Sequence, residues 1–176
     1  MYDYRFVTCT HDEHAMAILD ILNDAIVKST ALYDYHPRPI ESMRAWFDAK
    51  AGGRFPVIGA VDDSNALLGF ASYGTFRAWP AYKYSVEHSV YVHKDHRGSG
   101  IGHALMKQLI AAAVEQQYHV MIGGIDVANS ASVSLHEKLG FVHCGTIRQA
   151  GFKFGRWLDL AFYQLILPTP SEPRDG

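Results

Sequence analysis

Hydrophobic and polar residues alternate along the chain with two periods, which predict strands and helices. The clearest strand pattern covers residues 83–93. One of its faces carries Val86, His88, Val90 and Val92, and the other carries Glu87, Ser89, Tyr91 and His93. A glycine-rich turn follows, and Ile101, Leu105 and Leu109 then recur at the spacing of a buried helix face. Residues 83–117 are therefore predicted to form a strand, a turn and a helix, in that order.

The remaining elements are predicted from the same patterns and from glycine, proline and capping residues. Further strands are expected at 4–8, 55–61, 67–76, 120–125, 142–148 and 156–167. Helices are expected at about 11–30, 40–51, 100–117 and 129–140. We expect one of His11, Asp12 and Glu13 to cap the first helix. This order of elements indicates the α/β (α+β) class, with a mixed sheet and helices on both of its faces.

Composition restricts the classes of protein to consider. The 176 residues predict a single domain over 1–168, and we expect 169–176 to be a flexible tail. An apolar content of 48% is typical of a soluble globular protein, and a formal net charge of −2 argues against a broad nucleic-acid or anionic-membrane surface. The start of the chain lacks the pattern of a signal peptide, and no apolar run is long enough to span a membrane. Cys9 and Cys144 form no C-x-x-C pair, so we expect no disulfide, no metal site and a cytoplasmic location.

The glycine-rich turn carries the first candidate chemistry. Arg97 precedes Gly98, Gly100 and Gly102. Glycines allow the backbone to approach a ligand closely, and the N–H groups of a helix N-terminus attract anions. A diphosphate would fit such a turn. A dinucleotide-binding fingerprint is a poorer match because His103 stands where the third glycine belongs, and a P-loop motif is absent.

Two motifs in this order resemble those of the GCN5-related N-acetyltransferases, the GNAT family. The first is R-x-x-G-x-G, formed by Arg97, Gly100 and Gly102. The second runs from Asn129 to Phe141 and is similar to N-x-x-A-x-x-L-Y-x-K-x-G-F, with Ser132 at the small-residue position and His136 at the position of the tyrosine. The resemblance implies the GNAT fold, with a mixed and mostly antiparallel central sheet. It also implies acetyl-CoA as the co-substrate.

Further segments are similar to one branch of this family, the phosphinothricin and methionine sulfoximine N-acetyltransferases. They are residues 44–47, 71–77, 86–92, 135–137 and 151–159. This branch implies acetylation of the α-amino group of small amino-acid analogues and of some natural amino acids, by a homodimeric enzyme. The aromatic-rich segment 160–167 is a candidate dimer interface. The branch often has Asp-Trp where this chain has Thr75 and Phe76, which leaves the selectivity for the substrate side chain open.

The resemblance also implies roles for individual residues. Glu87 would be the general base, directly or through water, and His136 the general acid for the leaving thiolate. Backbone N–H groups of Val90 or Val92 would hold the thioester oxygen, provided that their strand separates from its neighbour near Gly123 and Gly124. The residues expected to bind acetyl-CoA are Val90, Tyr91, Val92, Arg97, Gly98, Ser99, Gly100, Ile101, Gly102, His103, Asn129 and Ser132. Those expected to bind the substrate are Arg77, Ala78, Trp79, Glu87, His88 and Ser89, with Arg148 and Arg156 as reserve cations.

Two other functions remain open at this point. A non-catalytic acyl-CoA sensor could have the same fold, although the presence of both Glu87 and His136 argues against it. A nucleotide-binding oxidoreductase would use Asp126, which follows the glycine turn at about the distance of a ribose-binding acid. His103, which stands where the third glycine of the dinucleotide-binding motif belongs, argues against the oxidoreductase.

Overall fold

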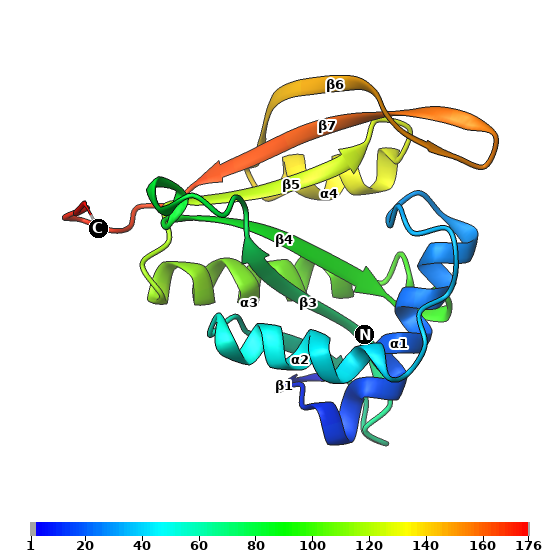
Figure 1. Ribbon diagram of the computed structural model, residues 1–176. Coiled ribbons are helices and arrows are strands. Elements are labelled where there is room, and N and C mark those ends of the chain that lie inside the picture. The colour runs from blue at the N-terminus through cyan, green and yellow to red at the C-terminus, as the bar shows by residue number, and fades with distance from the viewer. Residues whose placement is uncertain (1–2, 176) are drawn as a thin grey trace. The chain divides into compact units, whose positions relative to one another are not determined.

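The computed structural model describes residues 3–175 and contains both helices and strands in that range (Figure 1). The strands are β1 (Arg5–Thr8), β2 (Val57–Val61), β3 (Leu67–Thr75), β4 (Ser85–Val92), β5 (Val120–Asp126), β6 (Val142–Lys153) and β7 (Arg156–Ile166). The α-helices are α1 (His11–Lys28), α2 (Ser42–Gly52), α3 (Ile101–Glu115) and α4 (Ser130–Lys138). Two short 3₁₀ helices, η1 (Pro80–Tyr82) and η2 (Lys94–His96), flank β4. Every predicted element is present, with its ends shifted by a few residues in most cases.

The strands form one mixed sheet. Hydrogen bonding links them in the order β1-β2-β3-β4-β5-β7-β6. The pairs β1–β2, β2–β3, β5–β7 and β6–β7 are antiparallel, whereas β4 and β5 are parallel. The predicted fold class, a mixed and mostly antiparallel sheet accompanied by helices, is confirmed.

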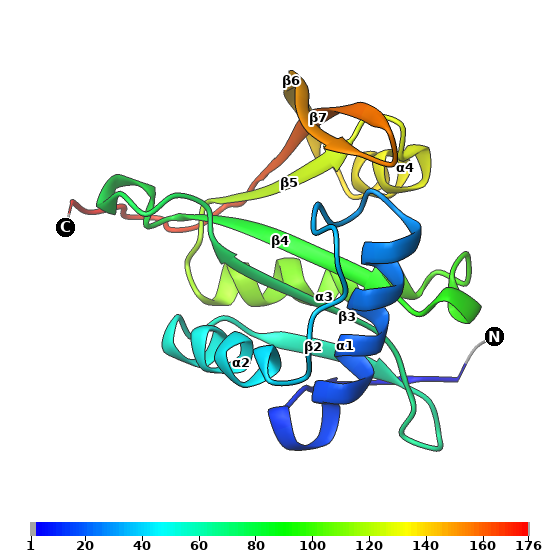
Figure 2. The same cartoon turned by 45° about the vertical axis from the view of Figure 1, so that its right-hand side comes forward.

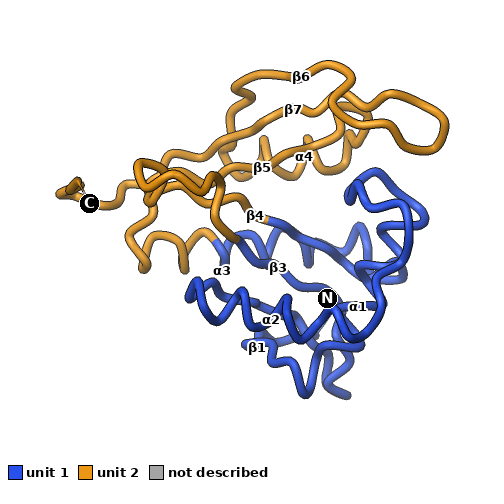
Figure 3. The backbone as a smooth tube through the Cα atoms, viewed as in Figure 1, with its two compact units in different colours: residues 1–73, 89–109 blue, residues 74–88, 110–176 orange. Residues whose placement is uncertain are grey.

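The chain divides into two compact units, which Figure 3 distinguishes by colour. Unit 1 comprises residues 1–73 and 89–109, and unit 2 comprises residues 74–88 and 110–176. Strand β4 and helix α3 each contribute residues to both units. The boundaries predicted from the sequence, one domain over 1–168 and a tail after it, stay a prediction.

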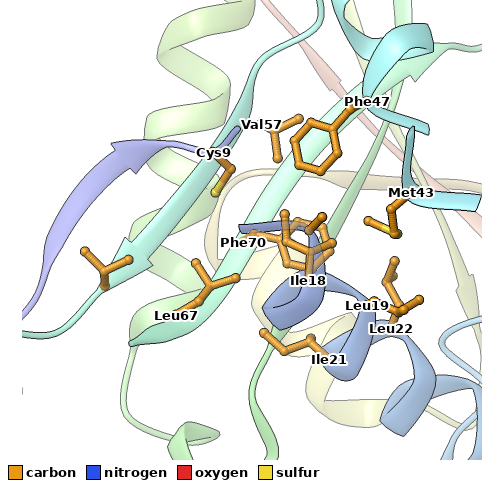
Figure 4. Packing of buried hydrophobic residues seen from close by; sticks show 12 residues of the cluster. Cys9, Ile18, Leu19, Ile21, Leu22, Met43, Phe47, Val57, Leu67 and Phe70 are labelled. Carbon is orange, nitrogen blue, oxygen red and sulfur yellow. The ribbon is translucent and has the colours of Figure 1, made fainter. Parts of the chain in front are cut away.

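Unit 1 is held together by an apolar core between α1, α2 and the first strands. Figure 4 shows the side chains of Ile18 and Leu22 from α1 facing Met43 and Phe47 from α2, beside Phe70 of β3. Burial of such side chains contributes about 2 kcal/mol each. The prediction that His11, Asp12 or Glu13 caps α1 was wrong. The cap is Thr10, one residue earlier, whose side chain accepts a hydrogen bond from the Glu13 N–H.

Unit 2 contains the long β6–β7 hairpin, which continues the antiparallel pairing from β5, with α4 close to β5 (Figures 1 and 2). The sequence placed the end of the first hairpin strand at residue 148, which was wrong, because β6 continues to Lys153. Its pairing with β7 is interrupted between Ile147 and Gly151 and then resumes. The register shifts between these two residues without ending the strand.

The end of the chain is attached to unit 2 by hydrogen bonds. The carbonyl oxygen of Thr169 lies 2.8 Å from His119 Nδ1, and the Arg174 N–H donates to the Tyr84 hydroxyl at 3.0 Å. Among residues 3–175, no helix is both long and apolar enough to cross a bilayer.

Candidate active site

The glycine-rich turn that follows β4 has the backbone geometry that its sequence predicts. Gly98 and Gly100 have φ of 76° and 86°, a region that favours glycine. A methyl group added at either glycine would meet no other atom within 4 Å, so the turn is open as well as left-handed. The first hydrogen bond of α3 runs from the Ala104 N–H to the Gly100 carbonyl at 3.1 Å. The N–H groups just before Ala104 therefore form the anion-attracting end of the helix.

Arg97 lies at the start of this turn and is held by two contacts within unit 1. Its Nε donates to the Val92 carbonyl at 3.2 Å, and its Nη2 lies 3.1 Å from Asp24 Oδ2. Asp24 belongs to α1 and also pairs with Lys28 one helical turn away. Sequence reasoning missed Asp24 because nothing in the pattern of α1 links it to the turn.

Glu87, the predicted general base, lies in unit 2 on β4 and is partly buried. Glu87 pairs in register with Ile122 of β5, and the Glu87 Oε1 atom lies 3.4 Å from where a Cβ on Gly124 would stand. Burial raises the pKa of the Glu87 carboxyl, and the positive charge of Arg77 opposes this shift. The Glu87 carboxylate is therefore partly desolvated, and it also interacts with the positive charge of Arg77.

The residues before β4 that were predicted to bind substrate are open to solvent. Arg77, Ala78 and Trp79 are exposed, and the Arg77 guanidinium lies 4.7 Å from the centre of the Phe76 ring. Ser89, on the unit 1 side of β4, is exposed as well. Of these residues, only Arg77 acts electrostatically on Glu87.

His88 and His136 form a buried pair of stacked imidazoles in unit 2. Their ring centres are 4.9 Å apart, and the two Nε2 atoms are 3.0 Å apart. His136 Nδ1 lies 2.7 Å from the Ser132 carbonyl, which fixes the proton on that nitrogen. His136 Nε2 then accepts, and His88 Nε2–H donates. The sequence placed His88 in the substrate site, but its side chain is buried against His136 and Phe141.

This arrangement bears on the general acid predicted at His136. Its one N–H is already donated to a carbonyl, and its other ring nitrogen faces His88. Burial lowers the pKa of His136, and the hydrogen bond to Ser132 opposes this shift. The role of His136 as a general acid stays a prediction. The contacts of both imidazoles within unit 2 also suit a structural role.

The buried pair is expected to make the protein less stable in weak acid. Burial, followed by the positive charge of His136, lowers the pKa of His88 from 6.5 to about 3. Below pH 6.5 the unfolded chain takes up a proton that the folded chain refuses. The free energy of unfolding should therefore fall by up to about 1.4 kcal/mol per pH unit as the pH drops.

Urea denaturation between pH 7 and pH 5 measures this slope. Ordinary carboxyl groups titrate mostly below that range, so they contribute little there. His88→Phe keeps a ring and removes the titrating group, so its slope should be smaller than that of the wild type. Equal slopes in the two proteins would show that His88 titrates normally.

The second motif places Asn129 at the start of α4. Its Oδ1 accepts a hydrogen bond from the Ser132 N–H at 3.1 Å, so the side chain caps the helix. The amide nitrogen of Asn129 is then the group that could donate to a pantetheine arm. Ser132 contributes backbone groups to the cap and to His136.

Two residues that were weighed for other functions pair with each other. Asp126 at the end of β5 is buried, and its Oδ2 accepts from Arg156 Nη2 at 2.9 Å. Asp126 Oδ1 also accepts from the Ala128 N–H. These contacts give Asp126 a structural partner in place of a ribose, and they occupy Arg156, a reserve cation for substrate. Arg148 lies on β6.

Comparison with known proteins places the chain in a family. The model of the acetyltransferase (GNAT) family matches residues 18–141. An L-methionine sulfoximine/L-methionine sulfone acetyltransferase of Pseudomonas aeruginosa PAO1 is 46% identical over 157 residues, which are 89% of this chain and 91% of that protein. A solved structure from Acinetobacter baylyi ADP1, provisionally named an acetyltransferase, is 64% identical with a TM-score of 0.98 and covers 100% of this chain and 98% of that chain.

A third relative has its cofactor bound. It is a phosphinothricin acetyltransferase from Sinorhizobium meliloti, solved in complex with acetyl-CoA, and is 31% identical with a TM-score of 0.92. The match covers 98% of this chain and 93% of that one. Together with the two motifs, these matches show that the chain belongs to the GNAT family of N-acetyltransferases, in the branch of the methionine sulfoximine and phosphinothricin enzymes.

Proposed function

We propose that this acetyltransferase transfers the acetyl group of acetyl-CoA to the α-amino group of a small amino-acid-like substrate, with Glu87 as the general base. The observation that carries the proposal is the position of Glu87. Its carboxylate is partly buried on β4, and its Oε1 lies 3.4 Å from where a Cβ on Gly124 would stand. A residue there can take a proton without being neutralised by an ion pair.

The raised pKa of Glu87 strengthens it as a base toward the ammonium proton of the substrate. A free α-amino group titrates near pH 8, so at neutral pH most substrate molecules carry one proton too many. Burial raises the pKa of Glu87, which makes it a stronger base than an exposed carboxylate. Glu87 would accept the ammonium proton, directly or through water, and leave the amine with a lone pair for attack.

The turn after β4 fits the diphosphate of CoA. Gly98 and Gly100 have a left-handed backbone, and α3, whose N-terminal N–H groups attract anions, starts directly afterwards. We assign the diphosphate to the backbone of residues 98–103 and the pantetheine arm to the backbone of Val90 and Val92. The role expected for Asn129, which belongs to unit 2, stays a prediction. Bound there, acetyl-CoA would supply an activated thioester.

Arg77 is the group that we assign to the substrate's acidic part. Arg77 belongs to unit 2, as Glu87 does. Its guanidinium is exposed, and its positive charge opposes the rise in the pKa of Glu87. Guanidinium binds a carboxylate, a phosphinate or a sulfoximine oxygen through paired hydrogen bonds. Ala78 and Trp79, on the same exposed segment, would contact the rest of the substrate.

A substrate panel tests this function. Release of CoA thiol from acetyl-CoA is measured with phosphinothricin, methionine sulfoximine, methionine sulfone and unmodified amino acids. We expect turnover with at least one of these amines and none with its N-acetylated form, which has no amine to acylate. Tight binding of acetyl-CoA without turnover on any amine would point to an acyl-CoA sensor instead.

The predicted homodimer remains part of the proposal, with one change of surface. The segment 160–167, a candidate for the interface, is mostly buried or partly buried within the chain, with Ile166 exposed. More large apolar side chains are exposed along the β6–β7 hairpin, namely Val142, Ile147 and Phe152 on β6, Phe154 in the turn and Trp157 at the start of β7. Light scattering after size exclusion measures the mass, and Trp157→Ser should lower it if this surface joins two copies.

A further inference from the structure

The two glycines in the middle of β5 accommodate different groups of β4. A Cβ on Gly123 would lie 2.8 Å from His88 Nε2 and 3.0 Å from His136 Nε2. A Cβ on Gly124 would instead lie 3.4 Å from Glu87 Oε1. Because neighbouring residues of a strand point to opposite faces, the imidazoles cover one face of β5 and the carboxylate lies on the other.

The parallel pairing of the two strands stops at this point. It joins Ser85, Val86 and Glu87 to Val120, Met121 and Ile122. The next position would set His88 against Gly123, where the imidazole occupies the space of the missing side chain. The imidazoles of His88 and His136 therefore lie where the pairing of β4 with β5 ends, one residue beyond Glu87.

We propose that the His88–His136 pair is a positioning device: an uncharged double spacer, seated on Gly123, that fixes β4 against β5 and so sets the position of the Glu87 carboxylate. This rests on the proposed function of Glu87 and adds the residues that place it. In this role, neither imidazole exchanges a proton with the substrate.

The surroundings of the pair favour a spacer. Both rings are buried, at 8% exposure for His88 and 2% for His136, and both make edge contacts with Phe141. His136 is tied to the backbone of its own helix through Ser132. His88 Nδ1 is buried and has no hydrogen-bond partner among the described residues. The His88 ring therefore positions its neighbours through its volume and through its one hydrogen bond, to His136.

Gly123→Ala tests the spacer directly, because its methyl group would enter the space of both rings. We expect kcat to fall about tenfold to a hundredfold, as a displacement of the order of 1 Å can cause, while KM for acetyl-CoA changes less than threefold. Adding His88→Ala to this variant should restore part of kcat, because the smaller side chain makes room for the methyl group. The matched control is Gly52→Ala in α2, where a methyl group meets nothing within 4 Å and kcat should not change.

The histidines give a second comparison. His88→Ala should lose kcat as Gly123→Ala does, whereas His88→Phe, which keeps the ring volume, should keep most of it with an unchanged pH profile. Loss of activity in His88→Phe equal to that in His88→Ala, in a folded protein, would overturn the proposal in favour of a role in proton transfer. If His88→Phe does not fold, Gly123→Ala decides alone, and wild-type kcat in that variant would also overturn it.

A readout without turnover separates this inference from the proposed function. The carboxyl pKa of Glu87 can be followed by carbon-13 NMR in the protein without substrate. Gly123→Ala should move it toward the value of an exposed glutamate, because a displaced β4 admits water, and Gly52→Ala should leave it unchanged. An unshifted Glu87 in Gly123→Ala contradicts the spacer even if no amine is a substrate, and a wild type without turnover contradicts only the proposed function.

Discussion

Glu87→Gln is expected to lower kcat by about a hundredfold to ten-thousandfold, the usual contribution of a general base. The amide has nearly the shape of the carboxylate but cannot accept the ammonium proton. The turn proposed to bind the diphosphate lies after β4 and does not include this side chain, so the affinity for acetyl-CoA should stay within about twofold. Steady-state kinetics with the best amine of the panel and calorimetric titration with acetyl-CoA measure the two quantities.

The pH dependence of the wild type offers an independent check on the same residue. Since burial raises the pKa of Glu87, kcat/KM should begin to fall at a higher pH than the ordinary titration of glutamate would cause. This acid limb should disappear in Glu87→Gln. Glu115→Gln, at the exposed end of α3, serves as the control and should behave as the wild type. Full activity in Glu87→Gln would assign the base to another group.

Gly100→Val is expected to abolish measurable binding of acetyl-CoA. The φ of 86° at Gly100 is strained for a side chain branched at Cβ, by about 1–3 kcal/mol. The space around the glycine is open, so the turn would change its backbone rather than clash. N–H groups that point elsewhere no longer hold a diphosphate. Calorimetry with CoA and with dephospho-CoA should show the same loss, because both ligands contain the diphosphate.

A second strained glycine controls for an effect on folding. Gly155, in the β6–β7 turn, has φ of 73° and the same open surroundings as Gly100. Gly155→Val should therefore lower the melting temperature to a similar degree and leave CoA affinity intact. Equal loss of affinity in both variants would mean that Gly100→Val acts through stability alone.

Local sequence was enough to predict the segment that carries most of the candidate site. The alternation along 83–93, the glycines after it and the helical spacing from Ile101 are properties of neighbouring residues, and the observed β4, turn and α3 follow them. Gly98 and Gly100 adopt the positive φ that only their residue type allows without strain. Prediction was poorer at the β6–β7 hairpin, because the register shift after Ile147 depends on the pairing with β7 and not on neighbouring residues alone.

By itself, then, the sequence determined the order of elements, the glycine turn and the family, since periodicity and motifs are local and their spacing is fixed by the chain. Tertiary structure alone decided the partners of the charged and titratable side chains. His136 meets His88 across 48 residues, and Arg97 meets Asp24 across 73. Such pairs depend on which faces of helices and strands pack together, and the pKa of each group follows from that packing rather than from its neighbours in the chain.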